Sequence, residues 1–420
     1  MRPLRVPDVV IARHHKGFPL STAGSRVDDL RGREVLGADF PTPLLVLRQP
    51  ELDHNLAAMQ QFCEQHALSL SPHVKTTMSP EIAQAQIEHG AWALTLATPT
   101  QLAAFRGLGA DRLLLANELC DPAAIEWLSG ELDEDPAFTC YCYADSIEGV
   151  EVLEKELARA SRTRPLPVIV ELGVPGGRTG ARGAGAALAV AGRVVASSHL
   201  ELAGVGGFEG VVPGSFGARL LGDVRAWLRE LAGLADRVLA RHDVAGEFVV
   251  TAGGTQYPEL VAAELSRSWR NGRPIRVVLR SGCYVTHDAL GYEQYRRLLA
   301  TEYAVMPLRS SLELWARVLS TPEPNLAIVD FGKRDTGMDS GFPVPLHRIR
   351  RGGTSLEAPP PGEVVAMNDQ HAYFRGENDL AVGDRIGFGI SHPCTTWDKW
   401  RVVPIVDERY VLTGVAQTLF

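Results

Sequence analysis

Eight short apolar segments recur between residues 68 and 280, and this cadence restricts the possible folds more than any other feature of the sequence. The segments are bounded by turn residues and have the length of buried strands. Helical patterns lie between them, for instance over 79–90, 99–107 and 146–160. The candidate strands are 68–73, 92–97, 112–116, 138–143, 167–172, 201–206, 248–252 and 275–280. Strands that alternate with helices predict a parallel (β/α)8 barrel, which typically needs about 250 residues. A doubly wound open sheet is the structural rival, and the count of eight favours the barrel.

The chain divides into three parts by pattern. Residues 1–40 form an irregular extension interrupted by glycine and proline, and 41–300 hold the barrel. Residues 301–420 lose the helical periodicity, and short apolar runs alternate there with Pro/Gly turns. The runs are 326–329, 364–367, 385–388 and 410–412. This pattern predicts a C-terminal all-β domain, to which the extension could add strands.

Composition excludes several classes of function. The formal net charge of −8, without a basic run, argues against a nucleic-acid surface. No apolar stretch reaches the ~18 residues of a membrane span, and the N-terminus lacks the apolar run of a signal peptide. Six cysteines in 420 residues are too few for a disulfide framework. We therefore expect a cytoplasmic protein with reduced thiols.

Lys75 is the first candidate for chemistry. It follows the first strand, and a strand would direct His73 and Lys75 to the same face. Active sites of these barrels lie at the carboxyl ends of the strands. A lysine that points inward there has little water around its ammonium, and the lowered pKa would suit a Schiff-base lysine. A solvent-exposed loop lysine is the commoner alternative.

Other unusual clusters follow later strands. Strand five leads into a glycine-rich loop around Arg178, which could bring a fork of donors to an anion or be a surface turn. Strand seven ends in Ala252-Gly253-Gly254-Thr255, either a phosphate-binding loop or a tight connection. Tyr284 follows strand eight, as a pocket wall, a proton donor or a packed core tyrosine.

The C-terminal part carries a candidate metal pair. On an extended segment His392 and Cys394, two positions apart, would face the same way, as two ligands of one ion must. A buried neutral pair is the alternative. Two ligands do not complete a tetrahedral site, and His371 and Asp398 are candidates for a further one.

Together these motifs resemble the D-serine dehydratase and D-threonine aldolase family of pyridoxal-phosphate enzymes, which has the alanine-racemase-type fold (fold type III). The motifs are Pro72-His73-Val74-Lys75-Thr76, Gly177-Arg178-Thr179-Gly180, Gly253-Gly254-Thr255 and His392-Pro393-Cys394. The resemblance covers nearly the whole chain. It implies a cofactor-bearing barrel, a β-domain with the metal ligands, and a homodimer.

The resemblance also implies roles for single residues. Lys75 looks like the lysine that carries pyridoxal phosphate, with His73 and Arg178 as its catalytic neighbours and Arg178 near the phenolic oxygen of the cofactor. Gly253, Gly254 and Thr255 look like phosphate ligands, and His392 and Cys394 like the metal pair. Cofactor contacts are also expected from Tyr284 and from Phe208, which stands where relatives often carry tyrosine.

The expected substrate is a small β-hydroxy D-amino acid. The thiolate ligand resembles the zinc-dependent dehydratases, so D-serine-type dehydration to a keto acid and ammonia is the first hypothesis. D-threonine-type aldol cleavage to glycine and an aldehyde is the second, with manganese as its metal. A non-catalytic carrier of pyridoxal phosphate is the alternative from another class, and a racemase is a weaker option because it has no use for a metal.

Overall fold

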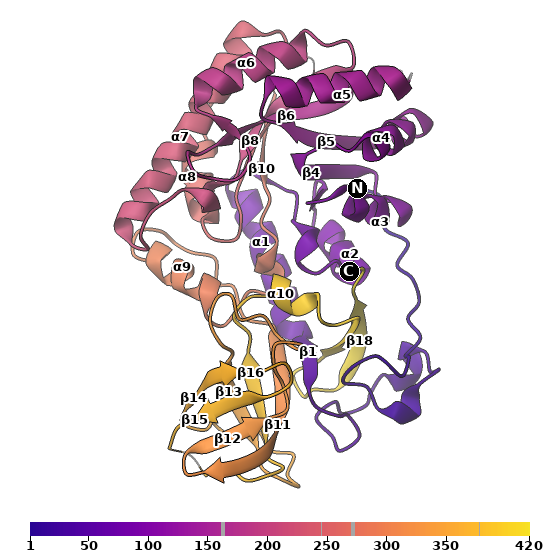
Figure 1. Ribbon diagram of the computed structural model, residues 1–420, viewed down its shortest axis with the longest axis vertical. Helices are drawn as coiled ribbons and strands as arrows, with labels where there is room; N and C mark the ends of the chain where they lie inside the picture. The colour runs from indigo at the N-terminus through magenta and orange to yellow at the C-terminus, as the bar shows by residue number, and fades with distance from the viewer. Residues whose placement is uncertain (161–163, 245, 270–273, 378) are drawn as a thin grey trace.

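A parallel barrel and a second, mixed sheet make up the protein (Figure 1). The computed structural model describes residues 1–160, 164–244, 246–269, 274–377 and 379–420. The barrel strands follow one another in the order β2-β10-β9-β8-β6-β5-β4-β3, all parallel, and the short β7 pairs with the end of β6. Their bounds are β2 Ser69–Leu70, β3 Leu94–Leu96, β4 Arg112–Glu118, β5 Thr139–Ala144, β6 Leu166–Gly173, β7 Ala181–Arg182, β8 Leu200–Gly207, β9 Phe248–Ala252 and β10 Ile275–Leu279. The predicted fold class is confirmed.

The two ends of this strand path meet. The Trp92 and Thr95 amides donate to the Leu70 and Pro72 carbonyls at 2.7 and 2.9 Å. A parallel bridge joins His73 to Thr95. These bonds link β2 to β3 and close the ring of strands. The residues that follow β2 therefore lie at the pocket at one end of the barrel.

Helices cover the outside of the barrel. They are α1 Gln49–Gln65, α2 Pro80–Glu88, α3 Pro99–Gly107, α4 Pro122–Glu134, α5 Ile147–Ala160, α6 Ala184–Val195, α7 Ala218–Arg241, α8 Pro258–Leu265 and α9 Gly291–Leu299. Three of them begin with a capping side chain followed by proline: Ser79, Thr98 and Asp121 each accept a backbone N–H from their helix. Inside the barrel, side chains from the neighbouring strands β4, β5, β6, β8, β9 and β10 pack together: Leu114, Tyr143, Ile169, Ala203, Val249 and Val278.

The second sheet lies below the barrel in Figure 1. Its strands are β1 Leu44–Arg48, β11 Leu312–Glu323, β12 Leu326–Val329, β13 Val344–Ile349, β14 Glu363–Met367, β15 Ala372–Arg375, β16 Arg385–Gly389, β17 Val402–Val406 and β18 Leu412–Gln417. β1 pairs with β11 and β17, so the strand that precedes the barrel cadence belongs to this sheet. The final predicted run, 410–412, ends where β18 begins, because Tyr410 has a positive φ of 60° in the preceding turn.

Residues 1–40 run from the barrel to the second sheet. The Arg5 amide bonds to Leu108 beside α3, whereas Val35 bonds to Tyr410. Apolar side chains of the extension, including Phe18 and Leu30, pack in a cluster on the second sheet. Within the described ranges, we find no helix with the length and apolar character needed to cross a bilayer.

Candidate functional site

A pocket opens at the carboxyl ends of the barrel strands and is named here the barrel pocket. It contains six of the residues singled out from the sequence: His73, Lys75, Arg178, Phe208, Gly253 and Gly254. Four residues that the sequence did not single out complete its lining: Ala116, Tyr143, Glu171 and Arg280. Side chains that are far apart in the sequence meet here because parallel strands end at the same edge of the barrel.

Lys75 lies in the short 3-10 helix η3 (Val74–Thr76) and not on a strand. The ladder of β2 stops at Leu70, so strand alternation does not set the direction of this side chain. Burial lowers the pKa of Lys75, and the positive charges of Arg178 and Arg280 act in the same direction. The nearby sulfur atoms of Cys394 and Cys283 oppose that shift. Lys75 therefore gives up its proton more readily than an exposed lysine does, and the neutral amine is the nucleophilic form.

His73 adjoins Lys75 and is held neutral. Burial lowers the pKa of His73 well below its usual value, with Lys75, Arg280 and Arg178 adding to the effect. Its buried Nδ1 atom has no partner among the described residues. A neutral imidazole in this place can contact a ring or accept a hydrogen bond without repelling the neighbouring lysine.

Two arginines bring positive charge to the barrel pocket. Arg280 is fixed by its own hydrogen bonds, with Nη1 donating to the Tyr143 hydroxyl at 2.7 Å and Nε to the Thr251 hydroxyl at 3.2 Å. The Arg178 guanidinium lies over the ring of Phe208, 4.9 Å from its centroid. The pocket is therefore suited to an anionic ligand.

The glycine loop after β9 already binds a carboxylate. Gly253 and Gly254 donate their amides to the two oxygens of Glu209, at 2.8 and 2.7 Å. Glu209 is fully buried, and Gly253 has a φ of +97° with no room for a side chain beside Leu279. Both amides of the loop are thus engaged by the chain's own Glu209, and phosphate binding by this loop stays a prediction.

Thr255 and Tyr284 lie outside the barrel pocket. The Thr255 hydroxyl accepts from the Cys283 amide at 3.0 Å, next to the loop after β10. Tyr284 is buried in the core, and its hydroxyl accepts from Gln86 at 3.1 Å. The structure thus gives Tyr284 a packing role and no place in the pocket lining.

A cluster of two thiols and one imidazole adjoins Lys75. His392, Cys394 and Cys283 offer ligand atoms that all lie within 4.8 Å of one another. The two sulfur atoms are 3.3 Å apart, and Thr76, the neighbour of Lys75, lies 3.4 Å from the Cys394 sulfur. Cys394 begins the short helix α10 (Cys394–Trp397), which packs against η3. The sequence had suggested an extended segment here, and the structure shows the start of a helix instead. His392 and Cys394, the two predicted metal residues, nevertheless belong to the same cluster.

Cys283 was missed by the sequence reasoning, although it stands beside Tyr284 in the same motif. A thiol hydrogen bond from Cys283 lowers the pKa of Cys394 to about 7. Bonds with Cys283 and Asp339 raise the pKa of His392 to about 9. The other candidate ligands do not belong to the cluster: His371 is exposed, and Asp398 pairs with Lys399 at 3.0 Å.

Three carboxyl groups form a second cluster, and one of them, Glu171, lines the barrel pocket. Glu118, Asp145 and Glu171 offer oxygens within 4.8 Å of one another. Asp145 accepts the Gly180 amide at 3.0 Å and so anchors the arginine loop. Burial raises the pKa of Glu118 to about 8, with the charge of Glu171 as the second cause. Glu118 therefore keeps its proton at neutral pH.

We expect Glu118→Gln to flatten the pH dependence of stability. Folded Glu118 binds a proton up to about pH 8, whereas the unfolded side chain loses it near 4.5, so folding stability falls as pH rises between these values. The variant cannot titrate, so its stability relative to wild type should increase from pH 5.5 to 8.5. The full pKa difference would give roughly 3 kcal/mol over this range, and solvent screening of the half-buried carboxyl reduces the expected gain to about 1–2 kcal/mol. Urea unfolding at both pH values measures this, with the exposed Glu148→Gln as control. An equal difference at both pH values would contradict the assignment.

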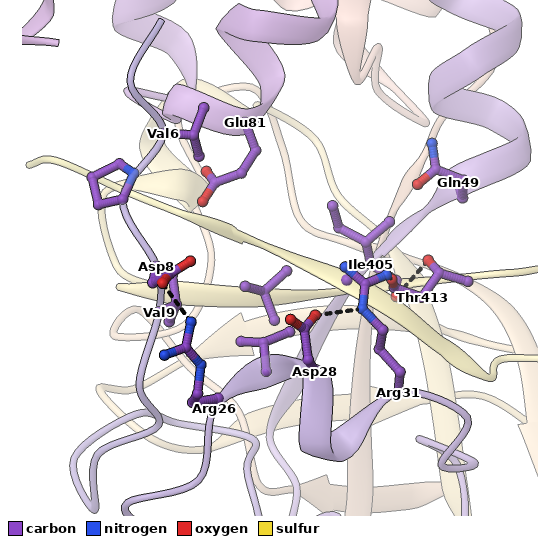
Figure 2. A pocket seen from close by; sticks show the side chains of 14 residues that line it. Val6, Asp8, Val9, Arg26, Asp28, Arg31, Gln49, Glu81, Ile405 and Thr413 are labelled. Atoms are coloured by element: carbon purple, nitrogen blue, oxygen red, sulfur yellow. Dashed lines mark hydrogen bonds and ion pairs between the residues drawn. The ribbon is translucent and has the colours of Figure 1, made fainter.

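A second pocket, drawn in Figure 2, lies between the N-terminal extension and the strands β17 and β18. Its charges are paired with one another: Asp8 binds Arg26, and Asp28 binds Arg31 at 2.8 Å. None of the candidate catalytic, cofactor-binding or metal-binding residues lines this second pocket.

These features define a barrel protein with a lysine, two arginines and a thiol–imidazole cluster around one strand-end pocket. The family described as "Putative serine dehydratase domain" matches residues 311–406. By sequence the chain is similar to D-threonine aldolase of Arthrobacter sp, with 26% identity over 81% of each chain. It is 25% identical to 3-hydroxy-D-aspartate aldolase of Paracoccus denitrificans (strain Pd 1222), over 75% of this chain and 80% of that one.

Solved structures show the same fold. D-threonine aldolase from Filomicrobium marinum superimposes with a TM-score of 0.71 at 21% identity, covering 91% of this chain and 96% of that chain. D-threo-3-hydroxyaspartate dehydratase from Delftia sp. HT23 gives a TM-score of 0.70 at 21% identity, covering 90% and 97%. The similarity therefore extends over both sheets.

Proposed function

We propose that the protein is a pyridoxal-phosphate- and metal-dependent lyase that cleaves β-hydroxy D-amino acids into glycine and an aldehyde. The observation that carries this proposal is that the candidate cofactor lysine and the candidate metal cluster lie next to each other at η3. Lys75 faces the barrel pocket, while the hydroxyl of the next residue, Thr76, contacts the sulfur of Cys394. A group that reacts at Cα and one that acts on the β-hydroxyl would then lie on neighbouring sides of one substrate.

The residues present fit pyridoxal phosphate. Lys75 supplies a buried amine, Arg178 and Arg280 supply positive charge, and the unpartnered Nδ1 of His73 is a buried polar atom. The two oxygens of the buried Glu209 accept the Gly253 and Gly254 amides and so hold the glycine loop in place at the edge of the pocket. The cluster of Cys283, His392 and Cys394 likewise has the donor types of a zinc site.

The chain's own residues would then divide the work. Pyridoxal phosphate, when bound, stabilises negative charge at Cα, and a divalent metal acts as a Lewis acid on the β-hydroxyl. Lys75 would hold the cofactor and, once released from it, would carry a proton to Cα. Arg178 and Arg280 bind anionic oxygens and keep the ligand oriented. As the Cα–Cβ bond breaks, the proton of the β-hydroxyl would pass to the Lys75 amine and Cα would receive a proton from the same amine, so glycine and an aldehyde account for all atoms.

Sequence similarity to two aldolases supports cleavage over dehydration, and this reverses the order of preference drawn from the sequence. Dehydration to a keto acid and ammonia remains the second candidate. It is favoured by the thiolates of the cluster, since a soft ligand set suits zinc, and by the match over 311–406. The homodimer implied by the resemblance stays a prediction.

Product analysis decides between the two reactions. The purified protein, loaded with pyridoxal phosphate and zinc or manganese, is incubated with D-threonine, D-threo-3-hydroxyaspartate or D-serine and with the L-enantiomers as controls. We expect glycine and an aldehyde from the D-substrates. Keto acid and ammonia without glycine would replace the aldolase assignment by the dehydratase one. If no substrate is consumed although the cofactor binds, the carrier alternative holds.

A further inference from the structure

The metal pair read from the sequence has a third member in the fold, and this member comes from the barrel. Cys283 lies in the 3-10 helix η5 (Cys283–Val285), directly after β10, and is 4% exposed. Its partners His392 and Cys394 come from the loop after β16 in the second sheet. The cluster therefore joins the two sheets of the protein. It lies next to Thr76, the residue that follows Lys75.

The geometry points to Cys283 as a third protein ligand of a thiophilic divalent metal, with one coordination position left open for the substrate. This assignment rests on the metal of the proposed function, but it concerns how the metal is held and not which bond is broken. Three protein ligands and an open fourth position are the arrangement of catalytic zinc sites, one of which is Cys2His.

Distances around the cluster agree with this assignment. Two thiolates on a tetrahedral zinc ion, with bonds of 2.3 Å, stand about 3.8 Å apart. The sulfur atoms of Cys283 and Cys394 are 3.3 Å apart as free thiols, so a shift of roughly half an ångström would admit the ion. The Thr76 hydroxyl lies within 3.6 Å of both sulfurs, and Tyr292 lies 3.5 Å from that of Cys283.

The imidazole is already oriented as a ligand. His392 Nδ1 lies 2.5 Å from a carboxylate oxygen of Asp339, and the other oxygen of Asp339 accepts from Thr395 at 2.8 Å. This carboxylate–histidine contact leaves Nε2 for the cluster and is the usual support of a metal-bound histidine. A hydrogen-bonded pair of thiols without metal would not need this orientation.

The ligand set determines which metal binds. Two thiolates neutralise both charges of a divalent ion and disfavour magnesium and manganese, which prefer oxygen ligands. A histidine–cysteine pair alone would leave two open positions and discriminate less. Cys283 therefore makes the site specific for zinc and similar ions.

Cobalt substitution tests the number of thiolates directly. Cobalt(II) gives a near-ultraviolet thiolate-to-metal absorption whose intensity rises with the number of sulfur ligands. The holoprotein, exchanged with cobalt, is compared with Cys283→Ser, Cys394→Ser and the exposed Cys120→Ser as matched control. We expect each of the first two variants to retain about half the band and to lose at least tenfold in zinc affinity in a chelator competition. Cys120→Ser should keep both at wild-type level.

The outcomes separate this inference from the proposed function. An unchanged band and unchanged zinc affinity in Cys283→Ser would overturn it, even if the enzyme is an active lyase. A halved band would support it, even if no D-amino acid is cleaved. Cys283→Ala provides a second variant if the serine protein does not fold, as judged by circular dichroism, and it must show the same half-intensity band.

Discussion

Lys75→Ala is expected to abolish the visible absorption band that pyridoxal phosphate develops with the wild-type protein, and to lower turnover of D-threonine by about 10³-fold or more. The amine is the group at the barrel pocket that can attach the cofactor covalently, and the same amine moves the proton at Cα in the proposed reaction. Spectroscopic titration with pyridoxal phosphate and a product assay measure the two effects separately.

The substitution should not damage the fold. Burial lowers the pKa of Lys75, so the folded state binds its proton less tightly than the unfolded state does, and the charged lysine costs stability below the ordinary pKa. Removing it should leave Tm equal or higher. Lys155→Ala, whose side chain is 81% exposed on α5, is the matched control and should keep band and turnover. A full band in Lys75→Ala would assign cofactor attachment to another lysine.

Much of the barrel could be predicted because each strand carries its own local signal. The candidate 248–252 coincides with β9, and 275–280 differs from β10 by a single residue. Continuous apolar runs between capped helices leave little choice, since such strands must be buried on both faces. The first strand was extended too far, to residue 73. Its backbone pairs with β3 only through isolated bonds there, and a single sequence does not show where a ladder stops.

The site was less accessible to sequence reasoning because it depends on direction within short turns. In η5 the sequence drew attention to Tyr284, yet its neighbour Cys283 faces the metal cluster while Tyr284 points toward Gln86. A 3-10 helix turns by about 120° per residue, so adjacent side chains diverge. The loop around Gly253 was found through its glycines, whereas Glu209, which binds the loop, lies on another strand connection and has no local signature.

Cys394→Ala is expected to separate cofactor binding from turnover. Its sulfur contacts the Thr76 hydroxyl at 3.4 Å and the Cys283 sulfur at 3.3 Å, while the barrel pocket itself is lined by other residues. The variant should therefore keep the visible band of the bound cofactor. It should lose turnover by roughly 10²-fold or more, because a Lewis acid at the β-hydroxyl lowers the activation barrier by several kcal/mol.

The control for this variant is Cys120→Ala, an exposed cysteine away from the cluster, which should retain band, metal content and turnover. Zinc content, measured after dialysis, should fall in Cys394→Ala and stay unchanged in the control. Full activity of Cys394→Ala would remove the metal from the mechanism, whereas loss of the cofactor band together with turnover would mean that the cluster shapes the barrel pocket instead of acting on the β-hydroxyl. Retention of the band with loss of metal and turnover is the result that joins Lys75 and the cluster into one active site.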